Sequence, residues 1–198
     1  DLLRQRLDRD GRQLHYCIDG KRIADLGKLV SPYLAGVYDP LLAAHPEFLW
    51  NATQETNRGC PYSCRFCDWG SATFSKLRQF PEERLLAELQ WFGQRKIEFL
   101  CNADANYGLL PRDTSLTRAT VAVKAMYGYP KRFKAAWAKN SNDRVFEMAS
   151  MLHRAEMDKG VTLSLQSLNP ETLKLVKRQN METNDFQGLM ARYRQAGI

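Results

Sequence analysis

Three cysteines lie within eight residues of the chain, close enough for their side chains to act on one centre. Cys60, Cys64 and Cys67 are spaced C-x3-C-x2-C in the stretch from Asn57 to Gly70. Thiolates are soft metal ligands, and iron–sulfur clusters are held by such cysteine groups. A structural zinc site is the alternative, but it usually takes four ligands in two C-x2-C or H-x3–5-H pairs, and only one such pair is present here. The spacing therefore favours an iron–sulfur cluster with one iron left open for chemistry.

The order C-x3-C-x-F-C, with Phe66 directly before the last cysteine, resembles the signature of radical S-adenosylmethionine (SAM) enzymes. The resemblance implies that Cys60, Cys64 and Cys67 bind three irons of a 4Fe–4S cluster, and that the amine and carboxylate of SAM chelate the fourth. It also implies that the reduced cluster passes one electron to SAM, giving a 5′-deoxyadenosyl radical that abstracts hydrogen from the substrate. Phe66 is expected to contact the cofactor, because its place inside the motif is fixed. Since the cluster and SAM would perform the radical-forming step, no side chain is assigned as catalytic.

The elements that must position this loop alternate between strand and helix from Phe48 onward. Helices are expected to begin near Pro81, Asp113, Asn142 and Asn169, and the last one is followed by a further helix that ends before Gly197. Strand–helix alternation predicts a parallel sheet with right-handed crossovers. The four expected strands cover residues 49–54, 97–101, 132–138 and 161–166.

The fourth expected strand, residues 161–166, places Thr162, Ser164 and Gln166 on one face. A flat doubly wound sheet would bury apolar residues on both faces. One polar face indicates a curved sheet whose inner wall lines a wet cavity. We therefore predict an α/β fold, specifically a partial (β/α) barrel, which is also the radical SAM core fold.

We expect an N-terminal extension and linker over residues 1–47 and the radical SAM core over residues 48–198. In the extension, Asp19-Gly20 predicts a two-residue hairpin turn. The family's core has six strand–helix units, whereas about four are predicted here. We therefore expect a core that is incomplete at its C-terminal end and inactive as a fragment, with a four-strand domain complete in itself as the alternative.

In barrels of this type the reactive residues lie in loops at the carboxyl ends of the strands. Asp104 and Asn106 follow the second strand, where the resemblance implies contact with the SAM amine; we expect Asp104 to contact this amine or the substrate, with Asn106 beside it. The family's glycine-rich acidic segment is replaced here by residues 102–106, Asn-Ala-Asp-Ala-Asn, and a turn in which these side chains bond the backbone is the alternative.

Four further residues are candidates for binding SAM. Lys139 follows the third strand, where it can reach a ribose hydroxyl or a carboxylate, although its neighbour Asn140 can equally cap the next helix. Ser164 and Gln166 are expected to face the cavity and bind ribose. The resemblance places Arg178 at the SAM carboxylate, which suits the fork of donors of a guanidinium group.

The charge and the cysteine content indicate the class of partner and the cellular compartment. The net charge of +7 is compatible with an anionic partner such as nucleic acid, but the basic residues are dispersed over the expected helices as on ordinary solvated faces. The chain contains no apolar run of transmembrane length and no signal-peptide pattern, which predicts a soluble, cytoplasmic protein without a membrane partner. Five cysteines, three of them clustered, suit a reducing compartment.

Three further stretches, Ser31-Pro32-Tyr33, residues 55–59 and Asp68-Trp69-Gly70, narrow the resemblance to radical SAM proteins with a cobalamin-binding domain ahead of the core. The chain has no D-x-H-x-x-G, so cobalamin and methyl transfer to an unactivated carbon follow from resemblance alone, and such a domain would precede Asp1. A reductant such as flavodoxin or ferredoxin is implied. The alternatives are an RNA-modifying, methylthiotransferase-like radical SAM enzyme and a non-catalytic iron–sulfur or zinc protein. The substrate cannot be identified from these residues.

Overall fold

A three-stranded parallel sheet lies at the centre of the structure, a computed structural model that describes residues 3–7, 13–17, 23–67, 77–139, 142–162, 164–181 and 183–198. Its strands are β3 (Asn51–Gln54), β6 (Phe99–Asn102) and β7 (Arg132–Lys134), in the order β3-β6-β7. Both pairings are parallel, and Gln54 lies opposite Asn102. The carboxyl ends of β3 and β6 are therefore level, and the predicted parallel sheet is confirmed.

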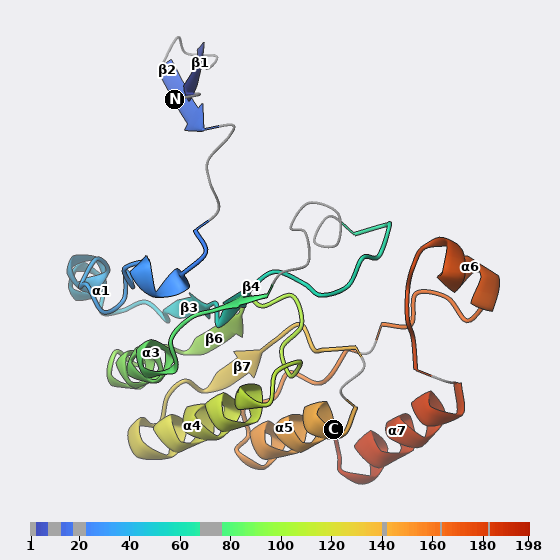
Figure 1. The fold of residues 1–198 in the computed structure, drawn as a ribbon. Coiled ribbons are helices and arrows are strands. Elements are labelled where there is room, and N and C mark those ends of the chain that lie inside the picture. The colour runs from blue at the N-terminus through green and yellow to red at the C-terminus, as the bar shows by residue number, and fades with distance from the viewer. Residues whose placement is uncertain are drawn as a thin grey trace.

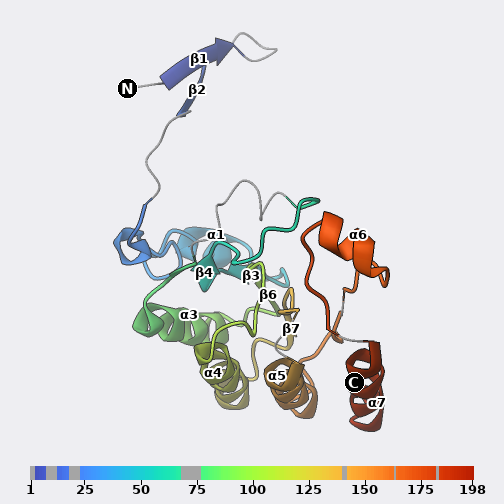
Figure 2. The same ribbon diagram turned by 45° about the vertical axis from the view of Figure 1, so that its right-hand side comes forward.

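Helices α3 (Glu82–Gln94), α4 (Arg112–Tyr127), α5 (Asn142–Arg154) and α7 (Thr183–Gln195) lie in a row along one side of the sheet (Figures 1 and 2). Helix α3 packs on α4, and α4 packs on α5. Pro81 precedes α3, and Gly128, in the left-handed region at φ +76°, ends α4. The predicted alternation of strand and helix is confirmed up to α5.

The main core lies between this row of helices and the sheet. Leu100 of β6, Phe92 of α3 and Met148 of α5 are fully buried, and Phe133 of β7 packs with them. A smaller cluster joins α7 to α5 through Ala149, Leu189 and Tyr193. Large apolar side chains on the inner face of each element thus fix the sheet against the helices.

The N-terminal part contains a hairpin and a segment that packs on the core. Strands β1 (Leu3–Leu7) and β2 (Gln13–Cys17) pair antiparallel, while the turn predicted at Asp19-Gly20 lies outside the described residues. After η1 (Leu26–Lys28) and before α1 (Asp39–Ala44), the Tyr33 hydroxyl donates to the Thr53 carbonyl at 2.6 Å. The division between residues 47 and 48 stays a prediction.

The fourth predicted strand does not form. Residues 161, 162 and 164–166 are described, and none of them is in a strand. Gln166 adopts φ +68°, which breaks an extended chain. The carbonyls of Ser164 and Leu165 accept hydrogen bonds from the side chains of Arg178 and Asn180 instead of from a neighbouring strand. Leu163 lies outside the described residues, and the barrel itself stays a prediction.

Two short elements border the cysteine loop. Strands β4 (Asn57–Arg58) and β5 (Arg78–Gln79) pair antiparallel before and after it. Helix α6 (Pro170–Leu175) begins as predicted, with the Asn169 side chain accepting from the Thr172 amide at 3.0 Å. Within the described ranges, no helix combines the length and apolar character needed to cross a membrane.

Candidate functional site

The three cysteines lie on the loop that leaves the carboxyl end of the sheet after β3 and β4. Cys60 and Cys64 are buried at 4% and 3% exposure, and Cys67 is partly exposed. The Cys67 amide donates to the Cys64 carbonyl at 3.1 Å, which curls the loop into a turn. Phe66, inside this turn, is half exposed. The sequence motif is therefore placed at the edge of the sheet where reactive residues were expected.

Asp104 ties the start of this loop to the segment that follows β6. Its Oδ1 accepts from the amides of Thr56 at 2.7 Å and Asn57 at 3.1 Å, and its Oδ2 accepts from the Thr56 hydroxyl and the Asn57 side-chain amide. Burial raises the pKa of Asp104, although the hydrogen bonds from the Thr56 hydroxyl and from the amides of Thr56 and Asn57 oppose the shift. Both carboxylate oxygens thus hold the chain just before the cysteines.

Asn106, two residues further on, contacts a cysteine directly. Its Nδ2 donates to Cys60 Sγ at 3.2 Å. Its Oδ1 is buried and has no hydrogen-bond partner among the described residues. Such a buried acceptor is costly to leave unpaired, so it is a ready acceptor for a donor on a bound ligand.

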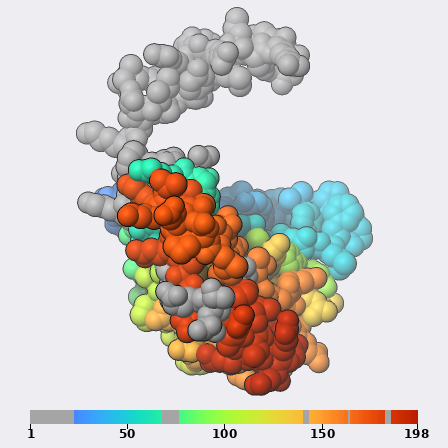
Figure 3. All heavy atoms as spheres, turned by 90° about the vertical axis from the view of Figure 1, so that its right-hand side faces the viewer, coloured from blue at the N-terminus to red at the C-terminus, as the bar shows by residue number. Residues whose placement is uncertain are grey.

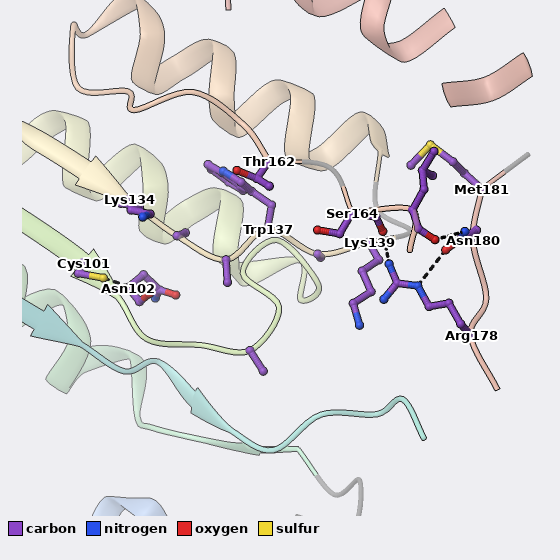
Figure 4. Close-up of a pocket in the computed structure, with 15 residues that line it drawn as sticks. Cys101, Asn102, Lys134, Trp137, Lys139, Thr162, Ser164, Arg178, Asn180 and Met181 are labelled. Carbon is purple, nitrogen blue, oxygen red and sulfur yellow. Dashed lines mark hydrogen bonds between the residues drawn. The ribbon is translucent and has the colours of Figure 1, made fainter. Parts of the chain in front are cut away.

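A cavity of about 410 Å³ opens at the carboxyl ends of β6 and β7 (Figure 4). This volume lies in the range of small-molecule pockets. Lys134, Lys139 and Arg178 line it, and no described lining residue carries a carboxylate. The cavity is thus a cationic site suited to a ligand with a negatively charged group. Its other lining residues include Asn102, Trp137, Thr162, Ser164 and Asn180.

Two contacts link the cysteine loop to the cavity wall or to the segment beside it. Lys139 Nζ lies 5.2 Å from the ring centroid of Tyr62, a cation–π contact. The Arg65 amide donates to the Val176 carbonyl at 2.9 Å, and Figure 3 shows this part of the loop against the α6 region. Burial, and then the neighbouring Cys60, raise the pKa of Tyr62, which Arg178 opposes. The cysteine loop and the cavity wall therefore contact each other through Tyr62 and Lys139.

Arg178 is buried at 5% exposure and forms part of the cavity wall. Its Nε donates to Asn180 Oδ1 at 2.8 Å, and its Nη2 donates to the Ser164 carbonyl. In Figure 4, Arg178 and Lys139 extend into the same part of the cavity. The predicted grouping of Lys139, Ser164 and Arg178 around one cavity is therefore present.

Gln166 does not belong to this group. It is exposed and is not among the residues that line the cavity. The expected alternation of the fourth strand would have turned Gln166 inward beside Ser164. The left-handed backbone of Gln166 interrupts that alternation. Its role in ribose binding stays a prediction without support from the geometry.

The residues present fit an iron–sulfur cluster. Three thiols occupy one loop, two of them shielded from water, and Asn106 presents a donor to one sulfur. In the described part of the chain, no three His, Cys, Asp or Glu side chains converge as they would around a single metal ion. Each thiolate of a 4Fe–4S cluster binds a different iron, so the three sulfurs do not need to meet at one point.

Several residues of the site were not found from the sequence. Thr56 and Asn57 bind Asp104 from about 47 positions away, and Arg112 Nη2 donates to the Thr56 carbonyl at 2.7 Å. The Asn180 side chain accepts a hydrogen bond from Arg178 Nε and donates one to the Ser167 carbonyl. Thr56 and Asn57 stood in a stretch that the sequence singled out, but their contacts could not be predicted, because they join segments that are distant along the chain. Asn140 and Asp68-Trp69-Gly70 lie outside the described residues.

Comparison with known proteins agrees with this arrangement. A family model, described as the radical SAM superfamily, matches residues 55–198. The 2-(S-pantetheinyl)-carbapenam-3-carboxylate methyltransferase of Streptantibioticus cattleyicolor is 47% identical over 165 residues, which cover 82% of this chain and 24% of that protein. The cobalamin-dependent radical SAM methyltransferase TokK of Streptomyces tokunonensis is 43% identical over 175 residues, which cover 87% of this chain and 26% of that protein. This chain thus spans about a quarter of the length of these relatives.

Solved structures share the fold. The apo form of OxsB, a cobalamin-dependent S-adenosylmethionine radical enzyme, matches with a TM-score of 0.60 at 16% identity, over 98% of this chain and 28% of that chain. The radical S-adenosylmethionine methyltransferase TsrM from Kitasatospora setae, with tryptophan and a SAM analogue bound, matches with a TM-score of 0.54 at 18% identity, over 79% of this chain and 30% of that chain. With its cysteine motif, its strand–helix order and a family match over residues 55–198, the chain belongs to the radical SAM superfamily.

Proposed function

We propose that this chain forms the cluster-binding and SAM-binding core of a cobalamin-dependent radical SAM methyltransferase. The observation that carries the proposal is the contact between the cysteine loop and the wall of a cationic cavity of about 410 Å³, through Tyr62 and Lys139. Both curated relatives are named as methyltransferases, and one of them as cobalamin-dependent. The RNA-modifying and non-catalytic alternatives have no comparable support.

In this proposal Cys60, Cys64 and Cys67 would hold a 4Fe–4S cluster, and Phe66, half exposed in the same turn, would contact the cofactor. When bound, the cluster and SAM supply one-electron cleavage chemistry that no amino-acid side chain provides. A one-electron reductant such as flavodoxin or ferredoxin is then required. Cobalamin enters the proposal from the relative TokK, which is named as cobalamin-dependent; the 198 residues themselves contain no D-x-H-x-x-G.

The side chains of the cavity orient SAM. Arg178 and Lys139 attract its carboxylate, since both cations extend into the cavity. Asn106 is not among the residues that line the cavity, but it contacts Cys60, and we propose that its unpaired Oδ1 accepts from the SAM amine. Ser164 lies where a ribose hydroxyl can bind. Asp104 acts through Thr56 and Asn57, which it binds with both oxygens, and so positions the loop rather than SAM.

Anaerobic reconstitution of the full-length protein tests the proposal. We expect about four irons and four sulfides per chain, as a 4Fe–4S cluster requires, and SAM cleavage to 5′-deoxyadenosine after reduction. With methylcobalamin, we expect methylation of 2-(S-pantetheinyl)-carbapenam-3-carboxylate or a related carboxylate, which is the substrate in one relative's name.

Two cysteine variants separate the ligand set from the fold. Cys64→Ala should lose the cluster and SAM cleavage. Cys101→Ala is the matched control, because Cys101 lies outside the loop at the end of β6 and its thiol contacts the Asn102 carbonyl. It should load iron normally. Stoichiometric zinc without iron would overturn the proposal, as would unchanged SAM cleavage in Cys64→Ala.

A further inference from the structure

The contact between Asn106 and Cys60 gives Asn106 a second role beyond ligand binding. Asn106 Nδ2 lies 3.2 Å from Cys60 Sγ, and both residues are 4% exposed. This side-chain hydrogen bond reaches a cysteine of the motif from a different segment of the fold, 46 positions away. The contact is therefore formed by the tertiary structure and is shielded from water.

The backbone around Asn106 is fixed on both sides. Tyr107 donates its amide to the Ala136 carbonyl at 2.8 Å and accepts from the Ala138 amide at 2.8 Å. The Tyr107 hydroxyl, deep in the core, bonds to Thr117 Oγ1 at 3.0 Å. On the other side, Asp104 is held by its four donors. Asn106 is thus presented to the sulfur from a rigid support.

The chemistry of the sulfur determines which end of the amide faces it. A cysteine bound to iron is a thiolate, which accepts hydrogen bonds and has no proton to donate. Only the Nδ2 group of Asn106 can then face Cys60, and Oδ1 is directed away from it. The arrangement found here has this orientation, with Oδ1 lacking a described partner. The amide is therefore already oriented for a metal-bound Cys60.

A donor aimed at a cluster sulfur changes the energy of the added electron. Hydrogen bonds to the sulfurs are among the factors that set the reduction potential of an iron–sulfur cluster. The positive end of the N–H dipole stabilises the more negative, reduced form, and low exposure to water strengthens this interaction. Three thiolates supply the bonds to iron, so the amide is not needed for assembly.

We propose that Asn106 is a positioning residue that raises the reduction potential of the cluster through its N–H···S hydrogen bond to Cys60. This inference rests on the proposed function, because it requires a cluster on Cys60. Its effect is on electron uptake, before any substrate is involved. It should therefore be measurable in the absence of SAM and of a methyl acceptor.

The experiment compares variants of the reconstituted full-length protein by redox titration followed by electron paramagnetic resonance. Asn106→Leu removes the donor with little change of shape, and Asn106→Ala removes it without adding bulk. Gln54→Leu is the matched control, because Gln54 is also buried, at 5% exposure, and its side-chain amide donates to the Leu85 carbonyl and to Glu88 and not to a cysteine.

We expect wild-type iron content in both Asn106 variants and a midpoint potential shifted to more negative values, with no such shift in Gln54→Leu. Equal potentials in wild type and the loaded Asn106 variants would overturn the inference. So would an equal shift in Gln54→Leu, or failure of both Asn106 variants to bind iron while Gln54→Leu binds it. Failure of the wild type to bind iron would instead refute the proposed function.

Discussion

The four hydrogen bonds to Asp104 predict that this residue supports the cysteine loop and does not bind SAM itself. In Asp104→Ala, the buried amides of Thr56 and Asn57 both lose their acceptor. A buried donor left unpaired costs about 1–3 kcal/mol, so two of them lower the free energy of unfolding by about 2–6 kcal/mol. The Thr56 hydroxyl and the Asn57 side chain can turn toward other partners, so they are left out of this sum.

Asp104→Asn should be much milder. An asparagine oxygen can keep both backbone donors, and the variant no longer buries a charge, which is the effect that raises the pKa of Asp104. We expect a loss of about 1–2 kcal/mol. Asp143→Ala is the control, because its side chain is 89% exposed and its ion pair with Arg192 should contribute about 0–1 kcal/mol.

Urea unfolding of the purified protein, followed by tryptophan fluorescence, measures these differences. SAM affinity of the reconstituted protein is measured in parallel. If Asp104 bound the SAM amine, losing a charged hydrogen bond in Asp104→Asn would weaken SAM binding about ten- to a hundredfold. That weakening in a stable Asp104→Asn, or wild-type stability in Asp104→Ala, would refute the role assigned here.

Three further predictions concern the loop after β6 and the cavity. Burial raises the pKa of Asp113 from 3.8 to about 6, so the stability from this carboxyl is present below pH 4 and is lost as the pH rises through about 6. A shift of this size corresponds to about 3 kcal/mol, and Asp113→Asn should flatten the unfolding free energy between pH 4 and 6; an unchanged slope would contradict this. Gly108→Ala should lower the melting temperature, because Gly108 has φ +94° and a Cβ there would lie 2.9 Å from Val145 Cγ2, whereas Gly188→Ala, where no atom lies within 4 Å, should not. Arg178→Lys should weaken SAM binding by calorimetry about tenfold, and an equal loss in the exposed control Lys174→Ala would contradict a specific role.

Asp113 also illustrates how local sequence rules were modified by packing. The sequence predicted Asp113 as the cap of a helix, but α4 begins at Arg112. The Asp113 Oδ2 instead accepts from the amides of Gly108 and Leu110, both at 2.9 Å, in the loop before the helix. The helix was predictable from its periodicity, whereas the use of its first carboxylate depended on the path of the preceding loop.

The sequence by itself determined the cysteine motif, the family and the strand–helix order as far as α5. These features depend on local spacing: C-x3-C-x2-C for the ligands, and apolar periodicity with Pro and Gly boundaries for the elements. They can be predicted because each one is contained within a few turns of chain. The parallel sheet then followed from the connecting helices.

Only the tertiary structure decided which polar residues serve the site and which support it. Asp104 and Asn106 are two positions apart, yet one binds the loop before the cysteines and the other reaches Cys60. The prediction of a fourth strand was wrong. The side chains of Arg178 and Asn180, more than ten positions away, donate to backbone carbonyls that would otherwise pair with a neighbouring strand. Hydrogen-bond partners distant in sequence are set by the packed fold, and local pattern carries no information about them.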